Sequence, residues 1–210
     1  MNKKIIVTIA RQYGSGGRYI GEKLAEALGC AFYDKELIDL AAKESGVDKA
    51  LFESNEEKTS SVWKSLIGRI NMMGGSPLSG HDMTLTDQLF LIQADVIRKI
   101  AERESCVIVG RAGNYILQDM PEATHIFVHA KEEDRINRIV THYGVEESKA
   151  KDLMIKTDKK RASFHEYYTG EKWGMANSYH LSIDSGCMEI EETADILARF
   201  AKARIERTLK

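Results

Sequence analysis

Short runs of apolar, mostly β-branched residues recur along the chain, and residues with helical periodicity follow most of them. The first run, 5–10, reads IIVTIA, which is typical of a strand buried on both faces of a parallel sheet. From Arg18 the apolar residues fall on one helical face, and Gly29 supplies the stop. The pattern therefore predicts a strand, a glycine-containing loop and a helix.

Four further apolar runs repeat this alternation. We expect strands at 31–33, 106–109, 126–128 and 181–183, with helices between them and a last helix after the fifth strand. Strands that alternate with helices form a parallel sheet with right-handed crossovers and helices on both faces. The predicted fold is one α/β domain with a five-stranded, parallel, doubly wound sheet.

Two segments of this domain need a separate interpretation. Residues 47–87 are the least regular, with Gly74, Gly75 and Pro77 in a loop between weakly helical pieces, and they are interpreted as an insertion. Residues 144–178 contain the most basic stretch, 149–161. Such a run is commonly an exposed helix face. Opposite a phosphate site it would instead serve as a lid that closes over a nucleotide.

The loop after the first strand is the predicted phosphate site. Residues Gly14, Ser15, Gly16 and Gly17 can turn successive backbone N–H groups inward, because glycine accepts positive φ and has no Cβ. The following helix adds the partial positive charge of its N-terminus. A simple tight turn is the alternative, but three glycines between a buried strand and a helix favour an anion cradle.

The segment IVTIARQYGSGGRYIGEKLAEALG resembles the first strand, loop and helix of the nucleoside monophosphate kinases, and most closely the cytidylate kinase-like family. The likeness continues through VIVGRAGNYIL after Cys106, through 130–139 and through 156–161. It implies a P-loop NTPase fold with a helical lid. It also implies a kinase that transfers the γ-phosphoryl of ATP or another nucleoside triphosphate, with Mg²⁺, to a nucleoside monophosphate or another small phosphorylated acceptor.

The loop departs from the standard G-x-x-x-x-G-K-[ST] pattern, in which the lysine reaches the β- and γ-phosphates. Alignment on the downstream Leu-Gly puts Arg11 at the first glycine, Gly17 at the lysine and Arg18 at the hydroxyl. Arg18 could replace the missing charge. A nucleotide-binding sensor that has lost transfer activity is therefore the second hypothesis. Ala112 stands where cytidylate kinases carry an aspartate, so the acceptor stays open.

The resemblance and the strand ends together select the candidate site residues. Asp34 and Arg111 follow the second and third strands, where an acceptor would bind, although Asp34 could equally cap the next helix. No metal ligands are assigned. The candidates are, for catalysis, Arg18, Arg111 and Arg161; for nucleotide phosphates, Gly14, Ser15, Gly16, Gly17, Arg18, Arg135, Arg138 and Lys159; and for the acceptor, Asp34 and Arg111.

Composition excludes several other classes. The 30 basic and 32 acidic residues nearly cancel, so no broad positive field favours nucleic acid. The N-terminal apolar run is too short for a signal peptide or a membrane span, and three cysteines without C-x-x-C spacing favour a reducing cytoplasm. A Rossmann-type dinucleotide site, suggested by Gly14-x-Gly16 and Asp34, is disfavoured because Tyr19 occupies the third glycine position.

Overall fold

The computed structural model describes residues 4–50 and 84–208. Most of the predicted insertion, 47–87, therefore lies outside the described residues. The described chain divides into two compact units. The first combines the residues up to Asp34 with those from Ile97 onward, and it contains the whole sheet. The second lies between Lys35 and Val96.

The sheet of the first unit is entirely parallel and has the strand order β2-β3-β1-β4-β5. The central strand β1 pairs with β3, Ile9 opposite Val109, and with β4, Ile9 opposite Ile126. The two loops that follow β1 and β3 therefore start side by side. The strands are β1 (Ile6–Arg11), β2 (Ala31–Tyr33), β3 (Cys106–Val109), β4 (Ala123–His129) and β5 (Leu181–Asp184).

All five predicted strands are confirmed, although β4 begins three residues before the predicted run 126–128. Thr124 and His125 interrupt the apolar pattern but are buried. His125 tolerates burial because its Nδ1 lies 2.8 Å from the Thr8 hydroxyl of the neighbouring strand. Because buried polar residues such as Thr124 and His125 interrupt an apolar run, the run alone does not show where the strand begins.

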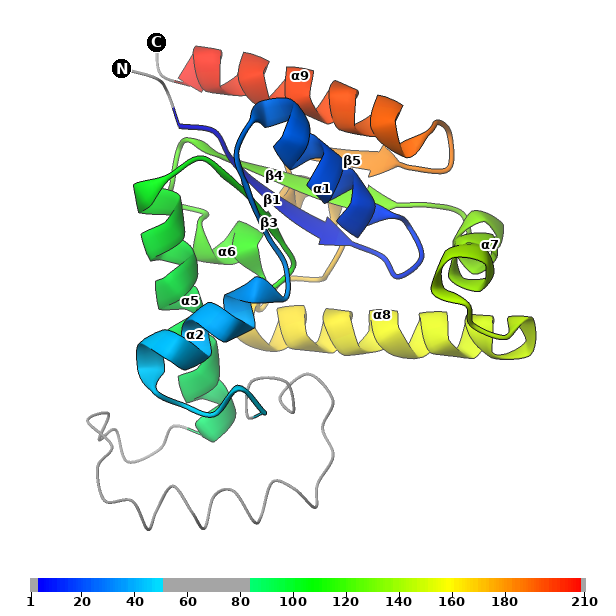
Figure 1. Ribbon diagram of the computed structural model, residues 1–210, viewed down its shortest axis with the longest axis horizontal. Helices are drawn as coiled ribbons and strands as arrows, with labels where there is room; N and C mark the ends of the chain where they lie inside the picture. Colours follow the sequence, from blue (N-terminus) through cyan, green and yellow to red (C-terminus); the bar gives the residue numbers. More distant parts are fainter. Residues whose placement is uncertain (1–3, 51–83, 209–210) are drawn as a thin grey trace. The chain divides into compact units, whose positions relative to one another are not determined.

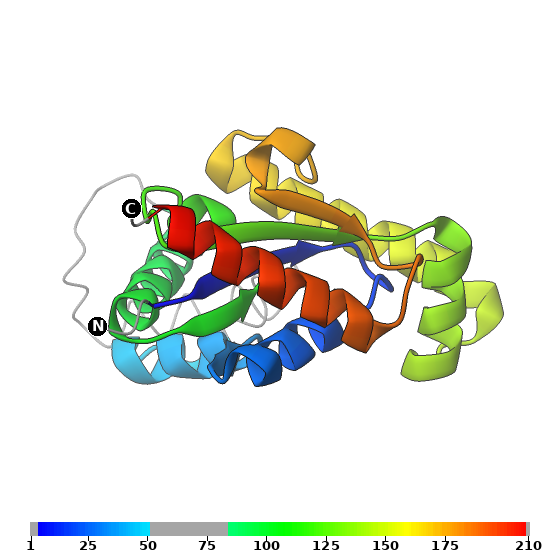
Figure 2. The ribbon, with the colours of Figure 1, turned by 90° about the horizontal axis from the view of Figure 1, so that it is seen from above.

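Helices cover both faces of the sheet, as expected for a doubly wound fold. Helices α1 and α9 pack together on one face, and α6 and α8 lie on the other (Figures 1 and 2). None of the helices among the described residues is long and apolar enough to cross a membrane. The helices are α1 (Gly17–Leu28), α2 (Glu36–Ser45), α5 (Leu85–Arg103), α6 (Gly113–Ile116), α7 (Glu132–Tyr143), α8 (Glu147–Thr169), the 3₁₀ turn η1 (Ala176–Ser178) and α9 (Ile190–Thr208).

The main core lies between the sheet and the pair α1 and α9. Ile20 and Leu24 of α1 and Leu197 of α9 are fully buried against strand residues such as Val7. Burial of each such side chain contributes about 1.5–3 kcal/mol. A smaller cluster of Ile139, Ala150 and Met154 joins α7 to α8. The first core fixes the N-terminus of α1 beyond the sheet, and the second fixes α7 and α8 to each other.

Candidate phosphate site

The glycine loop connects β1 to the N-terminus of α1. Gly14 has φ +78° and Gly16 has φ +77°, values that only glycine adopts readily. Ser15 is fully buried, and its hydroxyl donates to the Gln12 carbonyl oxygen at 2.8 Å. Helix α1 then starts at Gly17 without a side-chain cap. The loop thus presents backbone N–H groups at a helix N-terminus, the arrangement that suits an anion.

Helix α7 packs closely against two glycines of this loop, and at Gly14 it leaves no room for a side chain. A Cβ on Gly14 would lie 2.7 Å from the carbonyl oxygen of Arg135 and 2.9 Å from Cδ1 of Ile139. A Cβ on Gly16 would lie 3.4 Å from the guanidinium carbon of Arg138. Backbone conformation therefore favours glycine at both positions, and close approach also requires it at Gly14.

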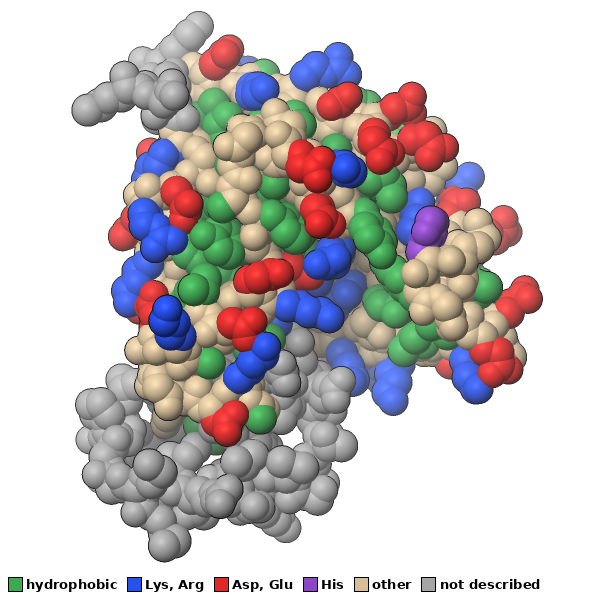
Figure 3. Space-filling model, viewed as in Figure 1, with side chains coloured by type: hydrophobic (Ala, Val, Ile, Leu, Met, Phe, Trp, Pro, Cys, Tyr) green, Lys and Arg blue, Asp and Glu red, His purple; other side chains and the backbone are tan. Residues whose placement is uncertain are grey.

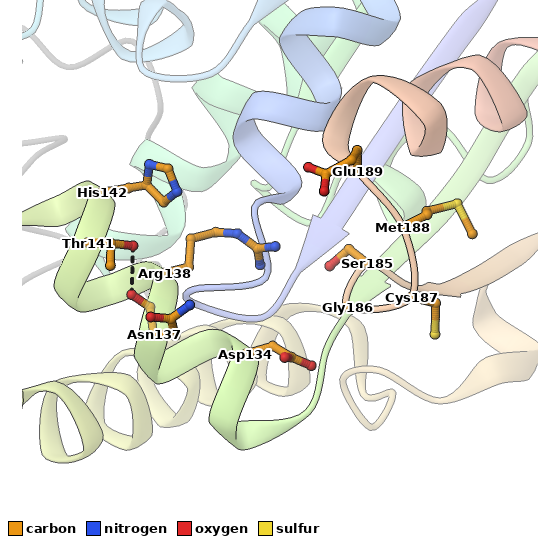
Figure 4. A pocket seen from close by; sticks show the side chains of 10 residues that line it. All are labelled: Asp134, Asn137, Arg138, Thr141, His142, Ser185, Gly186, Cys187, Met188 and Glu189. Carbon is orange, nitrogen blue, oxygen red and sulfur yellow. Dashed lines mark hydrogen bonds between the residues drawn. The ribbon is translucent and has the colours of Figure 1, made fainter.

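Arg138 projects from α7 across the loop. Its Nη1 donates to the Gly14 carbonyl oxygen at 2.8 Å, and its side chain lines a pocket of about 320 Å³ (Figure 4). One wall of the pocket comes from α7, and the other comes from the segment that follows β5. The lining residues are Asp134, Asn137, Arg138, Thr141, His142, Ser185, Gly186, Cys187, Met188 and Glu189.

Arg135 is directed to the back of the loop. Its Nε donates to the Tyr13 carbonyl oxygen at 2.7 Å, and its Nη2 forms an ion pair with Asp158 of α8. Asp158 also accepts from the Tyr13 backbone N–H at 2.7 Å. Only 8% of the Arg135 side chain is exposed. This arginine therefore links α7, α8 and the residue before Gly14.

Arg161 of α8 contacts the start of the same loop. Its Nη1 donates to the Arg11 carbonyl oxygen at 2.9 Å, and its guanidinium carbon lies 5.6 Å from the centre of the Tyr13 ring. Burial raises the pKa of Tyr13 above its ordinary value, and the Arg161 charge offsets part of that rise. Lys159, in the same helix, is exposed. The structure thus brings Arg161 to the loop and leaves Lys159 at the surface.

Arg18 and Arg11 meet at one carboxylate. Arg18 Nε donates to Asp34 Oδ2 at 2.9 Å, and Arg11 Nη2 lies 3.6 Å from Asp34 Oδ1. The Asp34 side chain is 10% exposed, whereas that of Arg18 is 42% exposed. The alternative that Asp34 caps α2 is wrong, because Lys35 occupies the N-cap position. Asp34 is instead the acidic centre of an arginine pair beside the loop.

The segment after β3 has unusual backbone geometry. Gly110, Arg111 and Ala112 have φ values of +82°, +58° and +51°. The left-handed conformation costs an ordinary residue about 1–2 kcal/mol. Strain of this kind persists where the surroundings impose it and is frequent at functional sites. Because β3 is the neighbour of β1, the strained segment and the glycine loop begin at the same edge of the sheet.

Three residues of this site were missed by the sequence analysis. Arg11 ends β1, Asp158 fixes Arg135, and Ser185 donates to the Ser15 carbonyl oxygen. The alignment identified Arg11 only as the residue at the first glycine position of the standard loop. A charged residue directly after a buried apolar run was a usable signal of a functional side chain. Asp158 and Ser185 gave no local signal, because their partners are distant in sequence.

On the face shown in Figure 3, acidic and basic side chains are intermixed. Among residues 4–50 and 84–208, no group of three or more His, Cys, Asp or Glu side chains is arranged to hold a metal ion. Magnesium in nucleotide sites is held mainly by phosphates and water with one or two carboxylates, so such a cluster is not required here.

The comparison of the sequence with family models gives one extended match. A model described as the cytidylate kinase-like family matches residues 6–186, which include the whole glycine loop, α7 and α8. No curated protein matches the sequence significantly.

Solved structures give matches over nearly the full chain. An uncharacterized protein from Eubacterium ventriosum is 28% identical, with a TM-score of 0.71, and the match covers 95% of this chain and 99% of that one. Shikimate kinase from Bacteroides thetaiotaomicron is 15% identical with a TM-score of 0.53, covering 94% and 98%. Shikimate kinase from Acinetobacter baumannii, in complex with shikimate, is 14% identical with a TM-score of 0.53, covering 96% and 95%. The two kinases share the fold of this chain.

Proposed function

This chain belongs to the cytidylate kinase-like family, and from that premise we propose that it is a phosphotransferase. The proposed reaction moves the γ-phosphoryl of ATP or another nucleoside triphosphate to a nucleoside monophosphate or another small phosphorylated acceptor. The observation that carries the proposal is the glycine loop at the N-terminus of α1, beside the pocket that Arg138 lines. A phosphate chain on the loop and a base in the pocket would together account for a bound nucleotide.

The donor nucleotide would be held mainly by backbone groups and by α7. Residues 14–17 supply N–H groups and the helix N-terminus. Arg138 is held by the Gly14 carbonyl oxygen, so its guanidinium is already positioned above the loop and can donate to phosphate oxygens. Arg135 supports the loop from behind through Tyr13. In this proposal Arg138 contacts nucleotide directly, and Arg135 acts chiefly through the loop backbone.

The acceptor would bind beyond β2 and β3. Arg111 follows β3 on a strained backbone, and Asp34 follows β2. Arg111 supplies a charge suited to an acceptor phosphate, and Asp34 positions Arg11 and Arg18 around it. Helix α8, with Arg161 and the exposed Lys159, would serve as the lid that excludes water.

The residues present are compatible with magnesium delivered with the nucleotide. Asp34 is the buried carboxylate beside the loop, and a magnesium-bound water could reach it without a dedicated protein cluster. When bound, the ion would neutralise charge on the phosphates during transfer. The residues of this chain would provide the remaining positive charge.

A non-catalytic nucleotide sensor is the second candidate. Gly17 stands where a kinase loop carries lysine, and Arg18 donates to Asp34. If no other side chain supplied the missing charge, the loop would bind a nucleotide without transfer. Both candidates predict that the protein binds a nucleoside triphosphate, but only the kinase predicts turnover.

A single experiment separates them. Purified protein is incubated with Mg²⁺, each of four nucleoside triphosphates and a panel of monophosphates and phosphorylated small molecules, and the products are separated by chromatography. Binding is measured in parallel by calorimetry. Formation of nucleoside diphosphate that depends on one acceptor supports the kinase, and binding without turnover supports the sensor. Absence of binding at millimolar triphosphate would contradict both.

A further inference from the structure

The side chain of Arg11 connects the two loops of the proposed site. Its stem crosses the first residue of α1, since a Cβ on Gly17 would lie 2.6 Å from Arg11 Cβ and 3.1 Å from Cγ. Its guanidinium reaches the segment after β3, where a Cβ on Gly110 would overlap Nη1 and lie 3.1 Å from Cζ. Arg11 thus extends from the end of the glycine loop at Gly17, where the donor would bind, to the segment after β3 at Gly110, where the acceptor would bind.

Both glycines are needed for this path. A side chain at Gly17 would collide with Cβ of Arg11, and a side chain at Gly110 would push the end of the guanidinium away from its position. The loss of lysine from position 17 and the presence of Arg11 are therefore structurally linked, because a lysine Cβ at that position would displace Arg11. The absence of a side chain at position 17 therefore removes the usual lysine charge and leaves room for the stem of Arg11.

The Arg11 side chain is paired with a carboxylate and is partly exposed to solvent. Asp34 Oδ1 lies 3.6 Å from Nη2, and the Arg11 side chain is 20% exposed. The Arg11 backbone is also held, because its carbonyl oxygen accepts from Arg161. A guanidinium has five N–H donors in one plane, so an ion pair with one carboxylate is compatible with donation to phosphate oxygens.

We propose that Arg11 replaces the missing loop lysine and contacts the phosphoryl group during transfer. This assignment rests on the proposed kinase function. Arg18 fits that role less well, because its Nε donates to Asp34 and its side chain is more exposed, 42% against 20%. The Arg11 side chain lies directly beside Gly17, where α1 begins, and beside Gly110, where the segment after β3 begins.

The chemistry requires positive charge at this point and no proton transfer. In the proposed reaction, the bond between the γ-phosphorus and the bridging oxygen breaks, and its electron pair leaves with the nucleoside diphosphate. An ionised oxygen of the acceptor phosphate forms the new bond to phosphorus. Charge on the transferring group and on the leaving oxygen is stabilised by fixed donors. The Arg11 guanidinium lies between the glycine loop and the segment after β3, so it would be close to both the transferring group and the leaving oxygen.

The test compares Arg11→Met, which keeps the length of the stem, with Arg11→Lys, which keeps the charge. Arg199→Met, an exposed arginine of α9, is the matched control. Affinity for Mg²⁺-ATP, turnover with the acceptor found in the panel, and binding of ADP with aluminium fluoride plus acceptor are measured. The last mixture mimics a transferring phosphoryl group. Melting curves show whether each variant is folded.

Arg11→Met is expected to lower kcat by about 100-fold or more and to lose the extra affinity for the aluminium fluoride mixture, with ATP affinity changed less than about 10-fold. Arg11→Lys should recover part of kcat. If Arg11→Met does not fold, Arg11→Gln takes its place, because glutamine keeps a hydrogen-bonding group and removes the charge. Unchanged kcat and unchanged affinity for the aluminium fluoride mixture in that variant would overturn the assignment. Full activity in a folded Arg11→Met protein would overturn this assignment and leave the kinase function intact. A wild-type protein that binds ATP but transfers nothing would overturn both.

Discussion

The Ser185 hydroxyl lies 2.5 Å from the carbonyl oxygen of Ser15. This contact joins the end of β5 to the centre of the glycine loop, and Ser185 also lies 3.0 Å from the His129 carbonyl oxygen at the end of β4. Both serines are almost completely buried. The conformation of the loop therefore depends on a residue that is 170 positions away in the sequence.

We expect Ser185→Ala to weaken both folding and nucleotide binding. Removal of the hydroxyl leaves a buried carbonyl without this donor, which costs about 1–3 kcal/mol of unfolding free energy. The loop is also less well positioned, so affinity for Mg²⁺-ATP should fall. Urea unfolding and calorimetry measure the two effects. Ser182→Ala is the control, because Ser182 is exposed on β5, and its stability should change by less than about 0.5 kcal/mol.

Gly16→Val should reduce nucleotide affinity much more than Gly29→Val does. Both glycines have positive φ, +77° and +63°, so both substitutions strain the backbone. Only at Gly16 does the new Cβ approach another group, the Arg138 guanidinium at 3.4 Å, whereas the space around Gly29 is open. Comparison of ATP affinities in the two folded variants separates strain from obstruction. Equal affinities would show that the loop is only a turn.

The sheet was predictable from the sequence because its strands are short, apolar and separated by helices. The run 106–109, for example, coincides with β3, since every residue in it is buried in a parallel sheet. The start of β4 was missed because Thr124 and His125 are polar residues in a buried strand. The contact of His125 with Thr8, a residue of another strand, is not visible in a local pattern.

The candidate site was only partly predictable for a related reason. The glycine loop is local, so its residues could be named from spacing alone. The direction of an arginine depends on contacts distant in the sequence. Arg135 lies against Asp158, and Arg18 lies against Asp34, so neither simply faces the loop as a sequence pattern suggests. Arg11 takes its observed path because Gly17 and Gly110 lack side chains where its stem and guanidinium lie.

Stability should fall as the pH decreases below about 6.5, and His125 should account for part of the loss. Burial, then the charges of His180 and Arg204, lower the pKa of His125 to about 3. At pH values above the unfolded pKa, both states hold a neutral imidazole and there is no penalty. Between about 6.5 and 3 the unfolded state binds a proton that the folded state does not, so the free energy of unfolding falls by at most about 1.4 kcal/mol per pH unit.

The variant His125→Gln tests this assignment, because glutamine keeps polar contacts and does not titrate. Its free energy of unfolding should depend less steeply on pH between 6.5 and 5 than that of the wild type, as measured by urea unfolding at several pH values. The pKa of His180 is lowered as well, by burial and by Arg204, so some dependence should remain. Identical slopes in the two proteins would show that His125 is not the titrating group.

The last prediction separates the donor side of the site from the acceptor side. Arg138 donates to Gly14 and lines the pocket of the proposed donor nucleotide, whereas Arg111 follows β3 on a strained backbone. Arg138→Ala should therefore weaken Mg²⁺-ATP binding by about 1.5–3 kcal/mol, one to two powers of ten, the range for a hydrogen bond to a charged group. Arg111→Ala should leave ATP affinity nearly unchanged and raise the KM of the acceptor or lower kcat. Calorimetry with ATP, followed by steady-state kinetics with the acceptor, measures both.

The Arg111→Ala variant keeps a Cβ at φ +58°. Backbone strain is therefore the same in the variant and the wild type, and it does not contribute to the difference between them. Equal losses of ATP affinity in the two variants would mean that both arginines contact the donor phosphates, and the division of the site into two halves would then be wrong.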